Sequence, residues 1–217
     1  MAASKELAKP VSRRQMLAVG GGSTALAAFL AACGSDSSST TGSTGMGGKS
    51  SGAGETAEFG KGDVGILNYA LTLEYLETAF YADVVKSGLF KGSDLETIRK
   101  FGLEEAEHVQ ALTAAVKSLG GKPAPEPKTA FPLKSAKQVL ELAGTVENLG
   151  AAAYLGQAAN IESPEVLASA LAIHSVEGRH AAALNTLLGE SITPDGAFAV
   201  PADVQTVLKS VEPFIVG

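Results

Sequence analysis

A set of acidic, aromatic and imidazole side chains occurs twice in this chain with nearly the same spacing. Each copy has a glutamate, a tyrosine seven residues later, and a Glu-x-x-His motif that begins 30 or 31 residues after the first glutamate. The two copies comprise Glu74, Tyr81, Glu105 and His108, and Glu147, Tyr154, Glu177 and His180. A single Glu-x-x-His motif is usually a polar pair on a solvated helix, but two in register with two further matched glutamates indicate a functional site.

Both Glu-x-x-His motifs interrupt apolar seams with helical spacing. The seams read Ile98, Phe101, Glu105, His108, Leu112, Ala115, Leu119 and Val166, Ala170, Ile173, Glu177, His180, Leu184, Leu187. Such seams bury one face of a helix, and the two earlier glutamates lie on similar seams. A buried carboxylate must be protonated, paired with a cation or bound to metal, and the nearest cations, Lys117 and Arg179, lie off the seams. Four carboxylates and two imidazoles therefore predict a site for two divalent or trivalent metal ions.

Glu77 is an alternative or additional ligand. It shares a seam with Glu74, but its counterpart in the second copy is Gly150, whereas Glu74 has Glu147 as its counterpart. We therefore favour Glu74 as the ligand and keep Glu77 as a seventh candidate.

The remaining polar residues near the motifs favour ordinary roles. Glu104 and Glu107 lie off the seam and are expected to be solvated, and His174, matched by Gly102, is expected to be structural or exposed. Tyr81 and Tyr154 fit either a core position with a locally satisfied hydroxyl or a role in electron transfer.

Helix-start and helix-stop signals divide residues 61–217 into four long helices. The expected ranges are 63–87, 93–119, 135–160 and 164–188, with a short fifth helix over 201–210. Ser93 with Glu96 and Ser135 with Gln138 form capping-box patterns, and Ser163 followed by Pro164 marks the start of the fourth helix.

The lengths of the connections predict the topology. Short loops join the first helix to the second and the third to the fourth, so each pair is expected to be an antiparallel hairpin. Residues 120–134, with four prolines, can extend up to about 50 Å, which is enough to run the length of the bundle. The third helix is therefore expected to lie parallel to the second, which brings the two copies of the motif together at the middle of the bundle.

From about residue 63 to 189, the chain resembles ferritin-like four-helix bundles. In that family, two helices each give a glutamate and two each give Glu-x-x-His, which together hold two iron or manganese ions. The resemblance implies terminal carboxylates at Glu74 and Glu147, bridging carboxylates at Glu105 and Glu177, and nitrogen ligands at His108 and His180. It also implies that Tyr81 and Tyr154 lie next to the ligands.

The N-terminal region predicts export. Arg13 and Arg14 precede an Ala/Gly-rich apolar stretch over 16–32, and the Ser12–Leu17 segment resembles a twin-arginine signal. Leu30-Ala31-Ala32-Cys33 resembles a bacterial lipobox, so residues 1–33 are expected to be a signal and Cys33 the lipidated residue; plain cleavage after Ala32 is the alternative. Residues 34–60, rich in Ser, Thr and Gly, are expected to form a flexible linker to the membrane. The segment Leu73–Glu77 followed by Phe80 and Tyr81 is similar to an exported, desiccation-associated ferritin-like branch.

Net charge and cysteine content exclude two classes of function. A formal net charge of −6 argues against nucleic-acid binding. Cys33 is the only cysteine, which excludes a fused four-cysteine iron domain, so a reductant must come from another molecule. We expect an envelope protein with two iron ions (or manganese) that oxidises Fe(II) or reduces peroxide; a homodimer is the candidate assembly, and the sequence leaves the oligomeric state open. The alternative is a metal-binding or stress-protective bundle without turnover.

Overall fold

The computed structural model describes residues 54–216, and the predicted signal, Cys33 and linker residues 34–53 lie outside this range. The described helices are α3 (Gly62–Ser87), α4 (Gly92–Ser118), α5 (Ala136–Gln157), α6 (Pro164–Leu188) and α7 (Val204–Val211), with 3-10 turns η2 (Ala158–Asn160) and η3 (Glu212–Phe214). Residues 54–216 contain no named strand, only one isolated β-bridge between Thr129 and Ile215. The all-α bundle prediction is confirmed. No helix in this range combines the length and apolar character needed to cross a membrane.

Helix ends follow the sequence signals at all but one of the long helices. The Ser135 and Ser163 side chains accept hydrogen bonds from the backbone N–H groups three residues ahead, and Gly88 and Gly189 end their helices in the left-handed conformation. The capping box predicted at Ser93 is wrong. Helix α4 begins one residue earlier, at Gly92, and no side chain caps it, so Ser93 lies inside the first turn.

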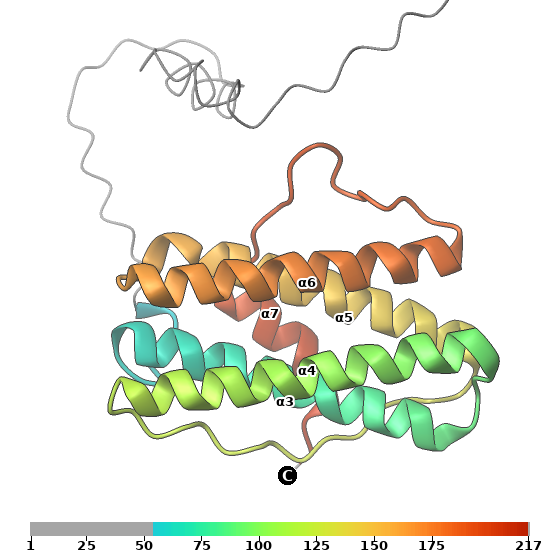
Figure 1. Cartoon of the computed structure of the whole chain (residues 1–217), viewed down its shortest axis with the longest axis horizontal. Coiled ribbons are helices and arrows are strands. Elements are labelled where there is room, and N and C mark those ends of the chain that lie inside the picture. The colour runs from blue at the N-terminus through green and yellow to red at the C-terminus, as the bar shows by residue number, and fades with distance from the viewer. Residues whose placement is uncertain (1–53, 217) are drawn as a thin grey trace, which may run out of the picture. The chain divides into compact units, whose positions relative to one another are not determined.

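The long connection crosses the bundle as predicted. In Figure 1, the segment between α4 and α5 runs along the whole length of the bundle, so that α5 starts at the same end as α4 and lies parallel to it. Helices α3 and α4 form one antiparallel hairpin, and α5 and α6 form the other. This topology relates the two hairpins by a pseudo-twofold axis and places both copies of the repeated motif at mid-bundle.

Hydrogen bonds fix this crossover at two places. The Asn68 side chain donates to the carbonyl of Lys122 at 3.0 Å and accepts from the N–H of Ala124 at 2.8 Å. Further along, the N–H of Ala130 donates to the carbonyl of Phe214 at 2.9 Å. The crossover is therefore bound both to α3 and to the C-terminal segment.

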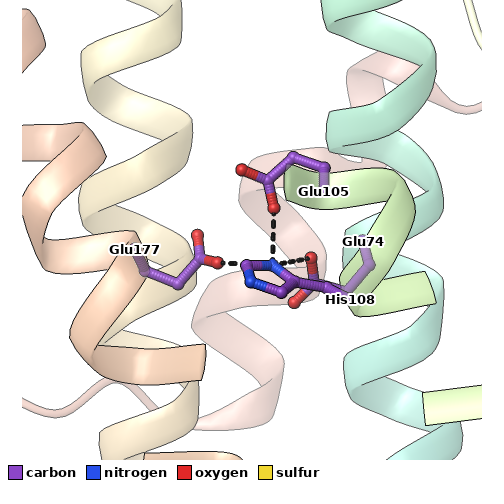
Figure 2. Close-up of side chains that lie close together, drawn as sticks. All are labelled: Glu74, Glu105, His108 and Glu177. Atoms are coloured by element: carbon purple, nitrogen blue, oxygen red, sulfur yellow. Dashed lines mark hydrogen bonds and ion pairs between the residues drawn. The ribbon is translucent and has the colours of Figure 1, made fainter. Parts of the chain in front are cut away.

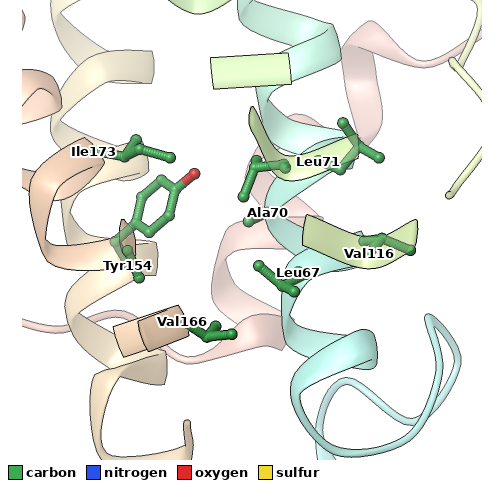
Figure 3. Packing of buried hydrophobic residues seen from close by; sticks show 9 residues of the cluster. Leu67, Ala70, Leu71, Val116, Tyr154, Val166 and Ile173 are labelled. Atoms are coloured by element: carbon green, nitrogen blue, oxygen red, sulfur yellow. The ribbon is translucent and has the colours of Figure 1, made fainter. Parts of the chain in front are cut away.

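Apolar side chains fill the bundle on either side of the polar repeat. Figure 3 shows the cluster at one end, to which all four long helices contribute: Leu67, Ala70, Leu71, Val116, Tyr154, Val166 and Ile173. A second cluster at the other end contains Phe80, Val84, Ile98, Phe101 and Leu184. Helix α7 adds Val204, Val207 and Val211, which pack on α3 and α5. These layers leave the polar repeat shielded from water.

The last residues of the predicted linker pack against the bundle. Phe59 lies edge-on to Tyr69 with ring centroids 5.6 Å apart, and its carbonyl accepts a hydrogen bond from Asn68. Thr56 is 1% exposed. Contacts with the helical domain therefore begin before residue 61.

Candidate metal centre

The four repeated glutamates lie at the centre of the bundle, one on each long helix. Glu74, Glu105, Glu147 and Glu177 are all 0% exposed. Their positions follow from the helical spacing, because each occupies a core-facing position of an otherwise apolar seam. His180 is buried, and the His108 side chain keeps 12% of its surface exposed.

The six predicted side chains form two overlapping groups of four. One group is Glu74, Glu105, His108 and Glu177, and the other is Glu105, Glu147, Glu177 and His180; within each, one candidate ligand atom per residue lies within 4.8 Å of all the others. Figure 2 shows the first group, with three carboxylates around the His108 ring. The two groups share only Glu105 and Glu177, the two carboxylates expected to bridge the metals.

Both histidines turn the same ring nitrogen toward the cluster. His108 Nδ1 lies 2.8 Å from Glu105, 3.2 Å from Glu74 and 3.2 Å from Glu177. His180 Nδ1 lies 2.8 Å from Glu105 and 3.3 Å from Glu147. Each imidazole thus faces the glutamate of its own half and a shared carboxylate.

The tyrosines connect the two halves of the bundle. Tyr81 on α3 donates its hydroxyl to Glu147 on α5, and Tyr154 on α5 donates to Glu74 on α3 at 2.5 Å. Each hydroxyl holds an oxygen of the glutamate in the opposite copy, so these tyrosines are core residues that also orient the cluster.

Several polar atoms of the cluster have no hydrogen-bond partner among the described residues. They are Glu105 Oε1, Glu147 Oε2, both carboxylate oxygens of Glu177, and His180 Nδ1. The short contact between His180 and Glu105 therefore lacks the geometry of a hydrogen bond. Buried polar atoms are normally paired, and orphaned acceptors that crowd together fit ligands converging on cations. The residues present thus suit a pair of metal ions.

Comparison with known proteins agrees with this geometry. Residues 62–190, more than half of the chain, match the ferritin-like domain family. The chain belongs to this family. No curated protein matches it. The matched residues of this ferritin-like domain include both Glu-x-x-His motifs and both earlier glutamates.

Protons compensate the buried charges of the ferritin-like domain in the absence of metal. Burial opposes protonation of His108 and His180, but the surrounding carboxylates raise their pKa values to about 12 and about 11. Burial raises the pKa of Glu74 to about 7 and also raises the pKa values of Glu147 and Glu177. Burial acts in the same direction on Glu105, but the hydrogen bond from His108 and the nearby charge of His180 lower its pKa to about 2. Metal binding must therefore displace protons.

Glu77 lies beside the cluster and belongs to neither group of four. It is 2% exposed, and burial together with repulsion from Glu177 raises its pKa well above the usual range. A Cβ atom at Gly150 would lie 2.9 Å from Glu77 Oε1 and 3.2 Å from Glu177 Oε2. The glycine in the second copy therefore makes room for the extra carboxylate of the first.

One residue expected to be solvated takes part in the site. The Glu104 side chain is 33% exposed, but its Oε2 also accepts a hydrogen bond from His180 Nε2 at 2.8 Å, a contact that the sequence analysis did not predict. Glu104 lies off the seam of α4, but the side of the helix that it occupies faces α6, a contact that periodicity within one helix does not reveal. The sequence feature that could have suggested this role is that Glu104 directly precedes the ligand Glu105. Glu107 is exposed, as expected, and His174 bonds to the carbonyl of Ala151.

Proposed function

We propose that this ferritin-like domain binds two metal ions, most simply iron, and oxidises Fe(II) or reduces peroxide in the cell envelope. The observation that carries the proposal is the pair of four-residue groups that share Glu105 and Glu177. Two overlapping sites with common carboxylates suit two ions held close together, which can exchange two electrons with one small oxidant.

The chain balances and shields such a centre. Four ionised glutamates carry four negative charges, which match two divalent ions, and the neutral Nδ1 atoms of the histidines add donors without charge. Bound iron would supply the electrons, two Fe(II) reducing one peroxide to two waters with uptake of two protons. Tyr81 and Tyr154 hold the outer glutamates in place, and the apolar clusters at both ends exclude bulk water.

The cavities next to the cluster favour small reactants. A cavity of about 20 Å³ is lined by Ala70, Leu112 and Tyr154. Ala70 and Leu112 lie one helical turn from Glu74 and His108, and Tyr154 donates a hydrogen bond to Glu74. Another, of about 10 Å³, is lined by Glu77 and Gly150. The larger has room for about one water-sized molecule, so neither cavity would admit a bulky organic substrate without movement of its lining.

Envelope location rests on the sequence. Arg13, Arg14 and Cys33 support export and lipid anchoring, and an external reductant would be needed for repeated turnover because the chain has no other cysteine.

Stopped-flow absorbance tests the reaction. The domain mixed with Fe(II) and then with oxygen or peroxide should oxidise iron faster than buffer, and Glu105→Ala and Glu177→Ala should abolish the difference. Glu107→Ala, on an exposed position of α4, is the matched control and should keep the rate. If the metal-loaded wild type neither accelerates Fe(II) oxidation nor consumes peroxide with any reductant, a binding or stress-protective role replaces the enzyme.

A further inference from the structure

Both ring nitrogens of His180 lie next to carboxylates, one inside the cluster and one behind it. Its Nδ1 faces Glu105 and Glu147, while its Nε2 donates to Glu104 Oε2 at 2.8 Å. The other oxygen of Glu104 lies 3.6 Å from the Lys100 ammonium group. The imidazole therefore has a carboxylate partner on the side away from the metal ligands.

An aromatic ring fixes the plane of the same imidazole. Phe101 stacks on His180 with ring centroids 4.1 Å apart and planes inclined by 27°. The His180 side chain is only 4% exposed. Stacking and the bond to Glu104 together restrict rotation of the ring in the metal-free chain.

His108 lacks both supports. Glu104 and Phe101 lie four and seven residues before His108, and the residues at the same distances before His180 are Val176 and Ile173. Neither aliphatic side chain can accept a hydrogen bond from an imidazole N–H group or provide an aromatic ring to stack on it. No hydrogen bond to His108 Nε2 is seen within residues 54–216, and the side chain is 12% exposed. The repeat is therefore symmetric in its ligands and asymmetric behind its histidines.

This asymmetry has a consequence for metal affinity. A carboxylate that accepts the outer N–H of a ligating histidine fixes the tautomer, leaves the inner nitrogen free to bind metal and makes it more basic. Loss of such a partner typically weakens metal binding by about 10- to 100-fold. Within residues 54–216, His108 has no such partner on its outer nitrogen, so it must bind metal without this help.

We infer that the two metal positions are unequal and that Glu104 is the positioning residue responsible. The position formed by Glu147 and His180 binds its ion first and more tightly. The position formed by Glu74 and His108 binds the second ion more weakly, so it is the one through which an ion exchanges with solvent. This inference rests on the proposed metal binding at the six ligands.

Titration of the metal-free full chain with Co(II), followed by its visible absorption, tests the order. We expect two steps that differ by about 10- to 100-fold in dissociation constant. His180→Ala should remove the tight step and His108→Ala the weak one. Loss of the tight step in His108→Ala, or two equal steps in the wild type, would overturn the inference while leaving the dinuclear site intact.

Exchanging the two outer residues gives the sharper test. Glu104→Val should weaken the tight step by about 10- to 100-fold, and Val176→Glu, which places a carboxylate at the equivalent position behind His108, should strengthen the weak step. Glu104→Gln keeps an oxygen acceptor and should restore part of the affinity. An unchanged tight step in both Glu104 variants would overturn the role of Glu104. Failure of the wild type to bind Co(II) at all would overturn the proposed function together with this inference.

Discussion

Most hydrogen-bond partners of the buried glutamates come from other helices. Tyr81 and Tyr154 each cross from one hairpin to the glutamate of the other, and the two histidines share Glu105. Isolated buried carboxylates would be strongly unfavourable, so the metal-free cluster retains protons. The same groups that hold protons would hold metal ions, which makes stability and metal binding depend on pH in opposite ways.

We expect the metal-free domain to lose stability between pH 5 and pH 8. Glu74, with a folded pKa of about 7, and the histidines, with values of about 11 and 12, all bind protons more tightly in the folded chain than in the unfolded one. Their stabilisation is complete below the unfolded pKa values and is lost as pH rises toward the folded ones. Urea unfolding at several pH values measures this trend.

The metal-loaded domain should show the opposite trend, because the ligands must release protons to bind metal. Glu105, with a lowered pKa of about 2, loses its contribution only below its unfolded pKa and does not affect this window. A metal-free chain that gains stability from pH 5 to pH 8 would contradict this account of the cluster.

Replacing Tyr81 by Phe removes the hydroxyl that Glu147 accepts. A hydrogen bond to a buried carboxyl group contributes about 1–2 kcal/mol, so the metal-free domain should unfold at lower urea concentration. Fe(II) oxidation should slow only modestly, because the six ligands remain. Tyr75→Phe is the control, since its hydroxyl makes no hydrogen bond seen within residues 54–216. Equal stability of the two variants would mean that the Tyr81 hydroxyl does not support the cluster.

At the residue scale, the sequence predicts the members of the cluster but not everything around it. The six repeated residues could be predicted because their seam positions and their 72- or 73-residue offset can both be read in the sequence. The structure brings all six together. Glu104 escaped prediction because its contact crosses from α4 to α6, and the relative rotation of two helices is not encoded in the periodicity of either one.

At the scale of elements, the crossover and the helix caps differ in how well the sequence specifies them. Four prolines over 123–132 and the length of the connection favour a crossover, and the structure has one. The cap of α4 was misplaced because Ser93 and Glu96 match a capping box, whereas the left-handed Gly92, with φ of 59°, starts the helix earlier. A capping-box motif does not reveal that the preceding glycine adopts a left-handed conformation and begins the helix one residue earlier.

The close approach of α3 and α5 predicts an effect at Gly150. Gly150→Ala would place a methyl group 2.9 Å from Glu77 and 3.2 Å from Glu177, so the carboxylates must move. We expect metal affinity to fall by about tenfold or more, as for other changes next to ligands. Overpacking should also destabilise the fold by about 1–3 kcal/mol, measured by urea unfolding.

Gly178→Ala provides the matched control on α6. Apart from its chain neighbours and the backbone of its own helix, no atom lies within 4 Å of the added methyl group, and alanine favours a helix over glycine by about 0.5–1 kcal/mol. This variant should keep its metal and become slightly more stable. If Gly150→Ala binds metal as tightly as Gly178→Ala, the space at Gly150 has no role in the site.

At the scale of the whole molecule, we expect the domain to be delivered folded to the envelope and anchored there. The twin-arginine route carries folded proteins, so metal could be loaded before export. Changing Arg13 and Arg14 to Lys should trap the precursor inside the cell, and Cys33→Ser should release or misprocess the protein. Cell fractionation with detection of the processed chain measures both. Normal anchoring of the double-Lys variant would indicate a different export route and later metal loading.

The central claim is that this bundle holds two metal ions on its repeated glutamates and histidines. The most direct measurement is the metal content of the purified domain after anaerobic incubation with Fe(II) and gel filtration. The account predicts about two ions per chain for the wild type. It predicts essentially none for the double variant Glu105→Ala and Glu177→Ala, which should keep its helical circular dichroism. A wild-type domain that retains no more iron, and no more manganese when that ion is offered instead, than the double variant would contradict the account.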